Sequence, residues 1–267
     1  MRHIISFSTG LSSAITVERV IQRHGRDSVH IVFMDTLIED ADNYRFLADC
    51  GQRWGDIITL TEGRTPYEVA KDRQIIANQK IAPCTFELKI ELFRDWLTAN
   101  FDGQAITIHI GYDFTELHRC GPTTENYGEF GWSVDYPLLW KPYETRPYKQ
   151  VARDWGIEPP RMYAAGYSHA NCGGRCFKQG QGDWLRTLMN SPELYAEAEQ
   201  WEQEMRDHPV RKNYAILRDQ RGGKVRALTL KEFRLSQIKK DLLQPSLLDF
   251  SQGGCVYCGV GDLAVKR

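Results

Sequence analysis

Short apolar runs alternate with helix-like segments throughout the first half of the chain, and this alternation limits the possible folds more than any other feature. The apolar runs predict strands at residues 4–7, 29–34, 57–60 and 105–110. The segments between them carry apolar residues at helical spacing and predict helices at residues 12–24, 42–54 and 87–97. Because strand and helix alternate, we expect an α/β fold with a doubly wound parallel sheet of about five strands. Ligands of such sheets bind at the carboxyl ends of the strands.

The second half of the chain has a looser pattern, in which Gly, Pro and aromatic residues interrupt the apolar runs from about residue 121. Further helices are predicted at residues 145–155, 192–206 and 230–242. Residues 215–218 and 225–228 flank a Gly-Gly turn and predict a hairpin. We therefore expect an α/β domain over residues 1–190 and an α-rich, cysteine-bearing extension over residues 191–267.

The charge of the chain is nearly balanced, with 34 Lys+Arg against 35 Asp+Glu. Such a chain has no overall attraction to phosphate backbones, so any nucleic-acid surface has to be local. The basic stretch from Arg211 to Lys240 is either a solvated face of the hairpin and helix or a patch for nucleic acid or an acidic protein. No apolar run approaches the roughly 18 residues of a membrane span, and the first residues lack a signal-peptide core. These features predict a soluble, cytoplasmic protein with no membrane partner.

A loop rich in hydroxyl groups follows the first predicted strand and precedes the first predicted helix. It contains Ser8, Thr9, Gly10, Ser12 and Ser13. Backbone N–H groups and the positive end of the helix dipole suit phosphate or sulfate at such a loop, although the same residues also suit a plain turn with a serine cap. The loop lacks the lysine of a Walker loop and the GxGxxG pattern, which disfavours both of those nucleotide-binding classes.

Acidic and hydroxyl side chains also follow the second predicted strand, at Asp35, Thr36 and Glu39. Neighbouring parallel strands end at the same edge of a sheet, so we expect these residues to face the same crevice as the serine-rich loop. Taken alone, they also suit a solvated turn that caps the next helix.

In this order, the two segments resemble the adenine-nucleotide α-hydrolase superfamily, which contains the N-type ATP pyrophosphatases with their modified PP-loop and the phosphoadenosine phosphosulfate (PAPS) reductases. Further residues match the family's motifs in family order, so that the resemblance covers about residues 3–190. They are Tyr44 and Phe46 after the second strand, then Pro83, Cys84 and Lys89, then Gly111, Glu116 and Arg119, and then Gly166, Tyr167, Cys172 and Cys176.

The resemblance implies that the protein binds an adenine nucleotide: PAPS, adenylylsulfate, or ATP with Mg²⁺. It implies that the nucleotide contacts Ser6, Ser8, Thr9, Gly10, Ser12, Ser13, Asp35, Thr36, Glu39 and Gly111. It also implies catalytic roles for Lys89 and Arg119, whose positive charges would contact the anionic group of the nucleotide.

The loop itself favours the reductase branch of this superfamily. Ser12 stands where N-type pyrophosphatases carry an Asp that is associated with metal-assisted attack on ATP, and Thr9 stands in place of a Gly. PAPS reductases also carry loops that lack this Asp. In a reductase, Cys258 would be the nucleophilic thiol, because its Cys-Gly-Val-Gly segment partly matches the family's Cys-Gly-(Leu/Ile)-His. A thioredoxin-like protein would then be the reductant.

The seven cysteines include two close pairs in glycine-rich sequence, Cys172-x3-Cys176 and Cys255-x2-Cys258. Two pairs supply four thiolates, which is enough to hold one metal centre, and Cys84 is a fifth candidate ligand. The spacing suits a [4Fe-4S] cluster or a zinc ion, and the resemblance favours the cluster. The alternative for Cys255 and Cys258 is a disulfide or redox pair.

Three functions remain open on the sequence. The one we favour is sulfur chemistry on a sulfonucleotide by a thiolate nucleophile, as in PAPS and adenylylsulfate reductases. The second is an ATP pyrophosphatase that adenylates a substrate for sulfur transfer, as in nucleic-acid thiolation. The third is a catalytically inactive, zinc-stapled module that binds nucleic acid with a steep salt dependence.

Overall fold

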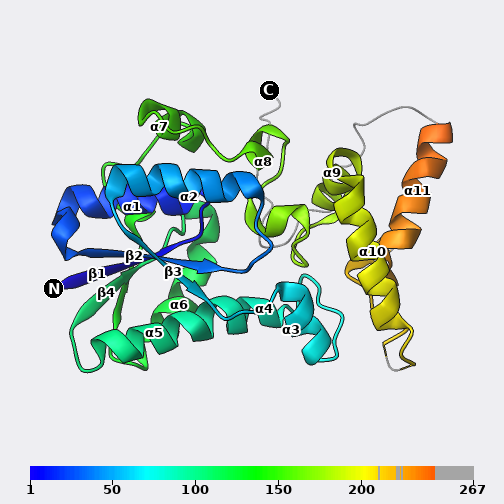
Figure 1. Ribbon diagram of the computed structural model, residues 1–267, viewed down its shortest axis with the longest axis horizontal. Helices are drawn as coiled ribbons and strands as arrows, with labels where there is room; N and C mark the ends of the chain where they lie inside the picture. Colours follow the sequence, from blue (N-terminus) through cyan, green and yellow to red (C-terminus); the bar gives the residue numbers. More distant parts are fainter. Residues whose placement is uncertain (210, 221–222, 224, 244–267) are drawn as a thin grey trace.

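The computed structural model describes residues 1–209, 211–220, 223 and 225–243. Its main feature is a five-stranded sheet in which every pair is parallel and the strand order is β3-β2-β1-β4-β5 (Figure 1). The strands are β1 (Arg2–Phe7), β2 (Val29–Asp35), β3 (Ile57–Thr61), β4 (Ile106–His109) and β5 (Ser133–Asp135). The predicted α/β class and parallel sheet are confirmed. Within the described residues, no helix is both long enough and apolar enough to cross a membrane.

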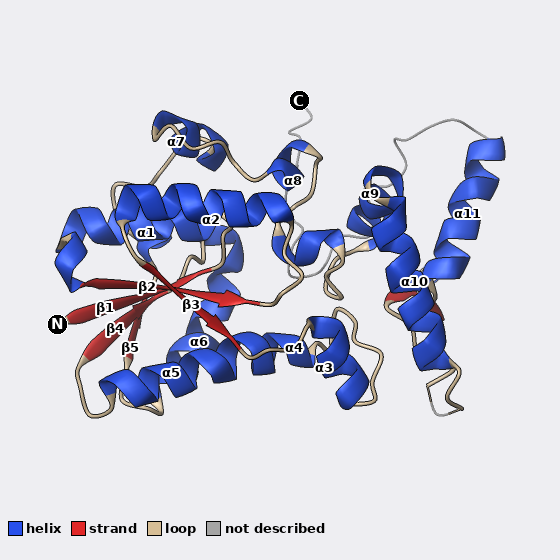
Figure 2. Cartoon of the chain, viewed as in Figure 1, coloured by secondary structure: helices blue, strands red, loops and turns tan. Residues whose placement is uncertain are grey.

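Helices cover both faces of the sheet, because the strands carry apolar side chains on both faces (Figure 2). Ile5 and Phe7 of β1 belong to one hydrophobic cluster, and Ile4 belongs to the cluster on the opposite face. The first face is covered by α1 (Leu11–His24), α2 (Ala41–Trp54) and α7 (Tyr148–Asp154). The second face is covered by α5 (Leu92–Phe101) and α6 (Leu117–Gly128).

The strand order creates a topological switch point between β1 and β4. The chain runs from β1 through β2 to β3 on one side of the sheet, and then crosses over to β4 and β5 on the other side. Connections that diverge in this way leave a crevice at the carboxyl ends of the two central strands. The serine-rich loop follows β1 and Gly111 follows β4, so both lie at this edge.

The four predicted strands are confirmed, with bounds that differ by one or two residues. The predicted helix at residues 87–97 starts with a π-helical turn, Phe86–Glu91, which continues into α5. The prediction missed β5, α3 (Pro66–Asp72), α6 and α9 (Gln181–Asn190). A capping box formed by Thr65 and Glu68 starts α3, and this signal was readable in the sequence. By contrast, α6 contains Pro122, a residue that normally argues against a helix interior.

Short helical segments complete this part of the chain. They are Arg26–Ser28, α4 (Pro83–Thr85), Phe114–Glu116, Pro137–Leu139, α8 (Arg161–Ala164) and Asn171–Gly174.

The predicted extension contains α10 (Pro192–Arg206), α11 (Leu230–Leu243) and an antiparallel hairpin, β6 (Leu217–Asp219) with β7 (Arg226–Leu228), and α9, from the end of the predicted α/β domain, packs against it. These helices lie to one side of the sheet, beyond the carboxyl ends of its strands (Figure 2). Trp184, Tyr195 and Phe233 form the centre of its core, which also takes in Ala70 of α3. The extension therefore shares its core with residues from the first half of the chain, on both sides of position 190.

One buried carboxylate ties the extension together. Glu202 of α10 is 1% exposed, and its two oxygens accept hydrogen bonds from Ile216 N (2.7 Å) and Leu230 N (2.6 Å). Burial raises the pKa of Glu202 to about 7, despite the two backbone donors and Arg206, which lower it. A raised pKa means that the stability contributed by this group is complete below its unfolded pKa and is lost as the pH rises through 7.

We expect Glu202→Gln to lower the free energy of unfolding by about 1–3 kcal/mol at acidic pH, since the amide has a single oxygen and leaves one buried N–H without an acceptor. Between pH 4.5 and pH 8 the difference should change by about 3 kcal/mol in favour of the variant, so that it disappears or reverses, because only the wild type has a carboxyl that must ionise while buried. Urea unfolding at the two pH values measures this. Glu204→Gln, on the exposed side of α10, is the matched control, and an equal difference at both pH values would contradict the prediction.

Candidate functional site

The loop between β1 and α1 leaves part of a helix amino terminus unpaired. The N–H of Leu11 donates to the hydroxyl of Tyr163 at 3.2 Å. For the N–H groups of Ser12 and Ser13, no acceptor is found in the described part of the chain. Free N–H groups at the positive end of a helix are suited to an anion. Ser12 and Ser13 therefore present N–H groups that suit an anion, and binding of phosphate or sulfate at this loop stays a prediction.

The hydroxyl groups of the loop are largely occupied by one another. Ser8 N donates to Ser13 Oγ at 3.1 Å, and the two serine hydroxyls lie 3.1 Å apart. Ser13 Oγ donates to the carbonyl of Gly10. Thr9 is fully buried, has a left-handed backbone with φ 56°, and donates its hydroxyl to the carbonyl of Ser8. Ser8 and Ser13 thus hold the shape of the loop, and Thr9 accepts a conformation that glycine adopts more easily.

Gly111 packs directly against the first turn of α1. A Cβ atom at this position would lie 2.9 Å from Thr16 Oγ1 and 3.1 Å from Ser13 N. The glycine is therefore required because the loop after β4 touches the backbone that presents the free N–H groups.

We expect Gly111→Ala to push the first turn of α1 away from its position, and to lower the free energy of unfolding by about 1–3 kcal/mol, as overpacking does. Anion binding at the loop should weaken at the same time. Chemical denaturation and nucleotide titration measure the two effects. Gly121→Ala is the control, because a Cβ at Gly121 of α6 meets nothing within 4 Å. Wild-type stability in Gly111→Ala would show that the contact is unimportant.

The residues after β2 form a second polar group at the same edge of the sheet. Asp35 accepts hydrogen bonds from Leu37 N and from the hydroxyl of Tyr44, both at 2.8 Å. Thr36 donates its hydroxyl to Glu39 at 2.9 Å. Thr36 and Glu39 are buried, so this pair is part of the interior of the site rather than a solvated turn.

Glu39 joins this group to the first cysteine pair. Its second carboxylate oxygen accepts the N–H of Cys172 at 2.7 Å. Cys172, Gly173 and Gly174 are consecutive residues with left-handed φ values of 54°, 55° and 79°. A Cβ at Gly173 would lie 3.1 Å from the carbonyl of Ile38. The two glycines allow the turn that folds the Cys172 segment onto the loop after β2.

Three of the predicted ligand cysteines come together at this turn. The thiol of Cys172 hydrogen bonds to Cys176, which raises the pKa of Cys172 and lowers that of Cys176. The pKa of Cys84 is raised to about 11, mainly by burial and in part by the nearby Cys176. Cys84 lies in α4, so two distant segments of the chain supply these thiols.

Lys89 lies among the same groups. Burial alone would lower the pKa of Lys89, but the negative charges of Glu39 and of the cysteines outweigh burial and raise it. Those cysteines are Cys172, Cys176 and Cys84. The raised pKa keeps the ammonium charged, and Glu39 and the three cysteines are near enough to influence it. The structure brings Lys89, Glu39 and three ligand candidates into one site.

Arg119 and Ser6 have different surroundings. The guanidinium of Arg119 forms an ion pair with Glu116 and lies 4.1 Å from the centre of the Tyr112 ring. These contacts are with residues of its own segment, and a catalytic role for Arg119 beside Lys89 stays a prediction. Ser6 lies inside β1, where it alternates with Ile5 and Phe7, so it belongs to the face opposite α1.

Two further residues of the site were not predicted from the sequence. Tyr163 caps α1 and lies 3.4 Å from the position of a Cβ at Gly10. Tyr67 donates its hydroxyl to the carbonyl of Arg175, inside the cysteine turn, at 3.1 Å. Both are aromatic residues in loosely patterned sequence, and no local signal distinguishes them from core residues.

Among the described residues, three donor atoms within 4.8 Å of one another occur in a histidine group and not in Cys84, Cys172 and Cys176. A [4Fe-4S] cluster or a zinc ion at these cysteines stays a prediction. Cys255 and Cys258, the other predicted ligands, lie outside the described residues, as does the predicted catalytic role of Cys258.

Charges in the basic stretch from Arg211 to Lys240 are partly neutralised. Arg234 pairs with Glu199 of α10 at 2.8 Å, and Arg226 pairs with Asp219 across the hairpin at 3.1 Å. Arg211 donates to the carbonyl of Met205. These contacts are those of a solvated face, and binding of nucleic acid here stays a prediction.

The fold and the site define an α/β protein of the doubly wound type, with a free helix amino terminus and a thiol group at the carboxyl edge of its sheet. The sequence matches no protein-family model and no curated protein. Among solved structures, the chain is similar to a phosphoadenylyl-sulfate (PAPS) reductase from Candida auris in a phosphate complex. The two share 12% sequence identity with a TM-score of 0.42, over 62% of this chain and 79% of that chain.

Proposed function

We propose that the protein is an enzyme that binds an adenine nucleotide at the switch point and performs thiol chemistry on a sulfonucleotide, namely PAPS or adenylylsulfate. The observation that carries this proposal is the convergence of Lys89 and three thiols next to Glu39. Hydrogen bonds join Thr36 to Glu39 and the N–H of Cys172 to Glu39, so the loop after β2 is connected to the cysteine turn, and Lys89 lies near both.

Charge supports an anionic ligand. The site holds the half-buried ammonium of Lys89 and, within the described residues, N–H groups of Ser12 and Ser13 that have no acceptor, all of which favour phosphate or sulfate oxygens. The loop also lacks an aspartate, which leaves no carboxylate in the loop to bind the Mg²⁺ of an ATP complex. The positive groups suit any anionic nucleotide, and the missing aspartate is what favours a sulfonucleotide over ATP.

The proposed reaction transfers a sulfonate group to a cysteine. A thiolate, assigned to Cys258, attacks the sulfur of the sulfonucleotide, and the S–O bond to the phosphate breaks. The nucleotide leaves with that electron pair, and a cysteine thiosulfonate remains. A thioredoxin-like dithiol attacks the cysteine sulfur, releases sulfite and forms a mixed disulfide. Its second thiol then resolves this disulfide, so that the dithiol is oxidised by two electrons and the enzyme thiol is restored.

Cys84, Cys172 and Cys176, with a ligand from Cys255, would hold a [4Fe-4S] cluster in this proposal, with zinc as the alternative. The convergence of three thiols around Lys89 supports a thiolate-bound centre, since a lysine stabilises nearby thiolates.

Turnover assays on anaerobically purified protein test the function. Sulfite release from adenylylsulfate or PAPS, dependent on a dithiol protein, is the expected result. Pyrophosphate release from ATP and Mg²⁺ would instead support the adenylating enzyme. Binding of nucleic acid with a steep salt dependence, together with no nucleotide turnover, would support the zinc-stapled module and reject the proposal.

A further inference from the structure

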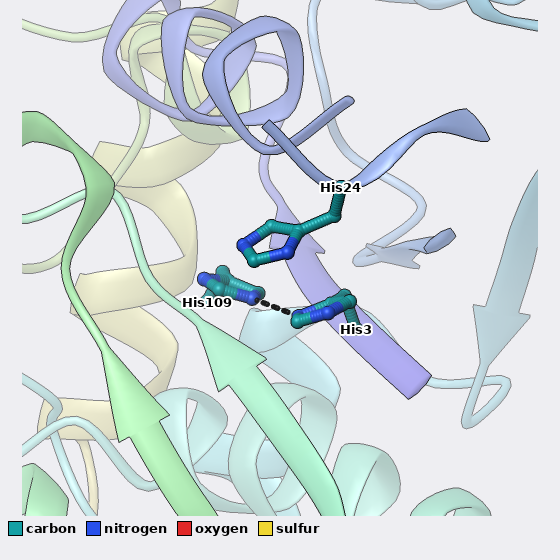
Figure 3. Close-up of side chains that lie close together, drawn as sticks. All are labelled: His3, His24 and His109. Carbon is teal, nitrogen blue, oxygen red and sulfur yellow. Dashed lines mark hydrogen bonds between the residues drawn. The ribbon is translucent and has the colours of Figure 1, made fainter. Parts of the chain in front are cut away.

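Three histidines that the sequence analysis did not single out gather on the α1 face of the sheet (Figure 3). His3 belongs to β1, His109 to β4, and His24 is the last residue of α1. One ring nitrogen from each lies within 4.8 Å of the other two. His3 Nδ1 and His109 Nε2 are 2.9 Å apart, and the rings of His3 and His24 stack with centroids separated by 3.7 Å.

The sheet topology explains this convergence. His109 pairs in register with Ile5, so it points to the same face of the sheet as His3. The last turn of α1 crosses this face and brings His24 over the other two rings (Figure 3). The group lies towards the amino-terminal end of β1, away from the serine-rich loop that follows Phe7.

The environment keeps the imidazoles neutral, which is the form that binds metals. His109 is fully buried and His3 is 7% exposed. Burial lowers the pKa of His109 to about 4, although Asp135 opposes the shift. Burial also lowers the pKa of His3 and of His24, which is the most exposed of the three. Arg23, which faces the Trp140 ring, adds to this effect at His24.

A second, independent observation points to a ligand. The Nδ1 atom of His109 is buried and has no hydrogen-bond partner in the described part of the chain. Its nearest carboxylate oxygen, from Asp135, lies 3.9 Å away. In metal sites, the ring nitrogen that does not bind the ion commonly donates to a carboxylate, which fixes the orientation of the ring. His109 and Asp135 are placed for this arrangement, with Nε2 of His109 facing the other two histidines.

We propose that His3, His24 and His109 form a three-imidazole site for a divalent transition metal, with Zn²⁺ as the probe ion, and that Asp135 supports His109 from behind. Three imidazoles are an established donor set for zinc and leave a fourth position for water. Nitrogens bound to one tetrahedral zinc lie about 3.3 Å apart, given a Zn–N bond of about 2.0–2.1 Å. The His3–His109 pair is already close to this spacing. The stacked ring of His24 has to tilt so that its lone pair converges with theirs, and its place at the end of α1 permits this movement.

Zinc bound here would join α1 to the two central strands. The test uses the full chain, loaded with Zn²⁺ and dialysed, with zinc counted per chain and its ligand distances measured by X-ray absorption. Wild type should hold one zinc with nitrogen ligands at about 2.0–2.1 Å, separate from any zinc with sulfur ligands at about 2.3 Å. His24→Gln should lose the nitrogen-bound zinc, and His208→Gln, an exposed histidine of the extension, should keep it.

A second variant distinguishes a loss of zinc binding from a loss of the folded structure. Asp135→Asn retains an oxygen for its bonds to Tyr136 N and Trp140 Nε1, and should weaken zinc binding by about 10- to 100-fold. Circular dichroism confirms that each variant is folded. Equal nitrogen-bound zinc in wild type and His24→Gln, or zinc bound through sulfur alone, would overturn the proposal. Neither result depends on nucleotide turnover, so this site and the proposed function fail separately.

Discussion

Lys89→Met is expected to weaken the binding of PAPS or adenylylsulfate by about 10- to 100-fold, because a charge-assisted hydrogen bond to an anion contributes about 1.5–3 kcal/mol. The pKa of this ammonium responds to both Glu39 and the cysteines, so its charge lies near the β2 loop and the cysteine turn. The dissociation constant should also become less sensitive to salt, since one ionic contact with the ligand is lost. Isothermal titration at two salt concentrations measures both effects.

Two further variants separate charge from packing at this position. Lys89→Arg keeps the positive charge and should recover part of the affinity, whereas a purely structural role would not distinguish Arg from Met. Lys80→Met removes an exposed lysine nearby in the sequence and should leave binding unchanged. Thermal unfolding of Lys89→Met reports any loss of fold, because the buried carboxylate of Glu39 would lose a nearby positive charge. Wild-type affinity in folded Lys89→Met would remove Lys89 from the binding site.

Cys176→Ser is expected to abolish the sulfur-bound metal of the protein and its turnover of sulfonucleotide, and to leave any zinc bound by nitrogen ligands in place. Serine supplies no thiolate at neutral pH, and the Cys172 thiol loses the partner to which it donates. The loss of metal should exceed the roughly 10- to 100-fold effect that follows from the loss of a supporting contact. Iron, sulfide and zinc analysis on anaerobic protein measures the content, and sulfite release measures turnover.

The control for this variant is Cys120→Ser, which removes a partly buried thiol of α6 away from the cysteine turn. It should retain metal and activity. Nucleotide affinity in Cys176→Ser should stay close to that of wild type, because the serine-rich loop and Lys89 are intact. Full metal content in Cys176→Ser would show that Cys84, Cys172 and Cys176 do not form one centre.

The secondary structure of the sheet was readable because its signals are local. Each strand is a short apolar run, and the period of the next helix is visible within a dozen residues. The elements that the prediction missed have weaker local signals. β5 has three residues, and α6 includes Pro122, whose cost is offset by packing of Tyr127 into the core. Tertiary contacts outweigh local propensity in such segments.

The candidate site was predicted only in part. Loop residues such as Ser8 and Ser13 follow directly from their position between a strand and a helix. The contact of Glu39 with the N–H of Cys172 does not, because it depends on how the cysteine turn packs onto the loop after β2. The separate surroundings of Lys89 and Arg119 are likewise a result of packing.

The sequence by itself determined the α/β class, the position of the serine-rich loop and the spacing of the Cys172 pair, because these properties arise from residues that are neighbours in the chain. The tertiary structure alone decided which distant residues meet. Cys84 reaches Cys176 through the packing of α4, and His3 meets His109 because the strand order places β1 beside β4. Strand order and loop packing depend on the free energy of the whole fold, and no local pattern encodes them.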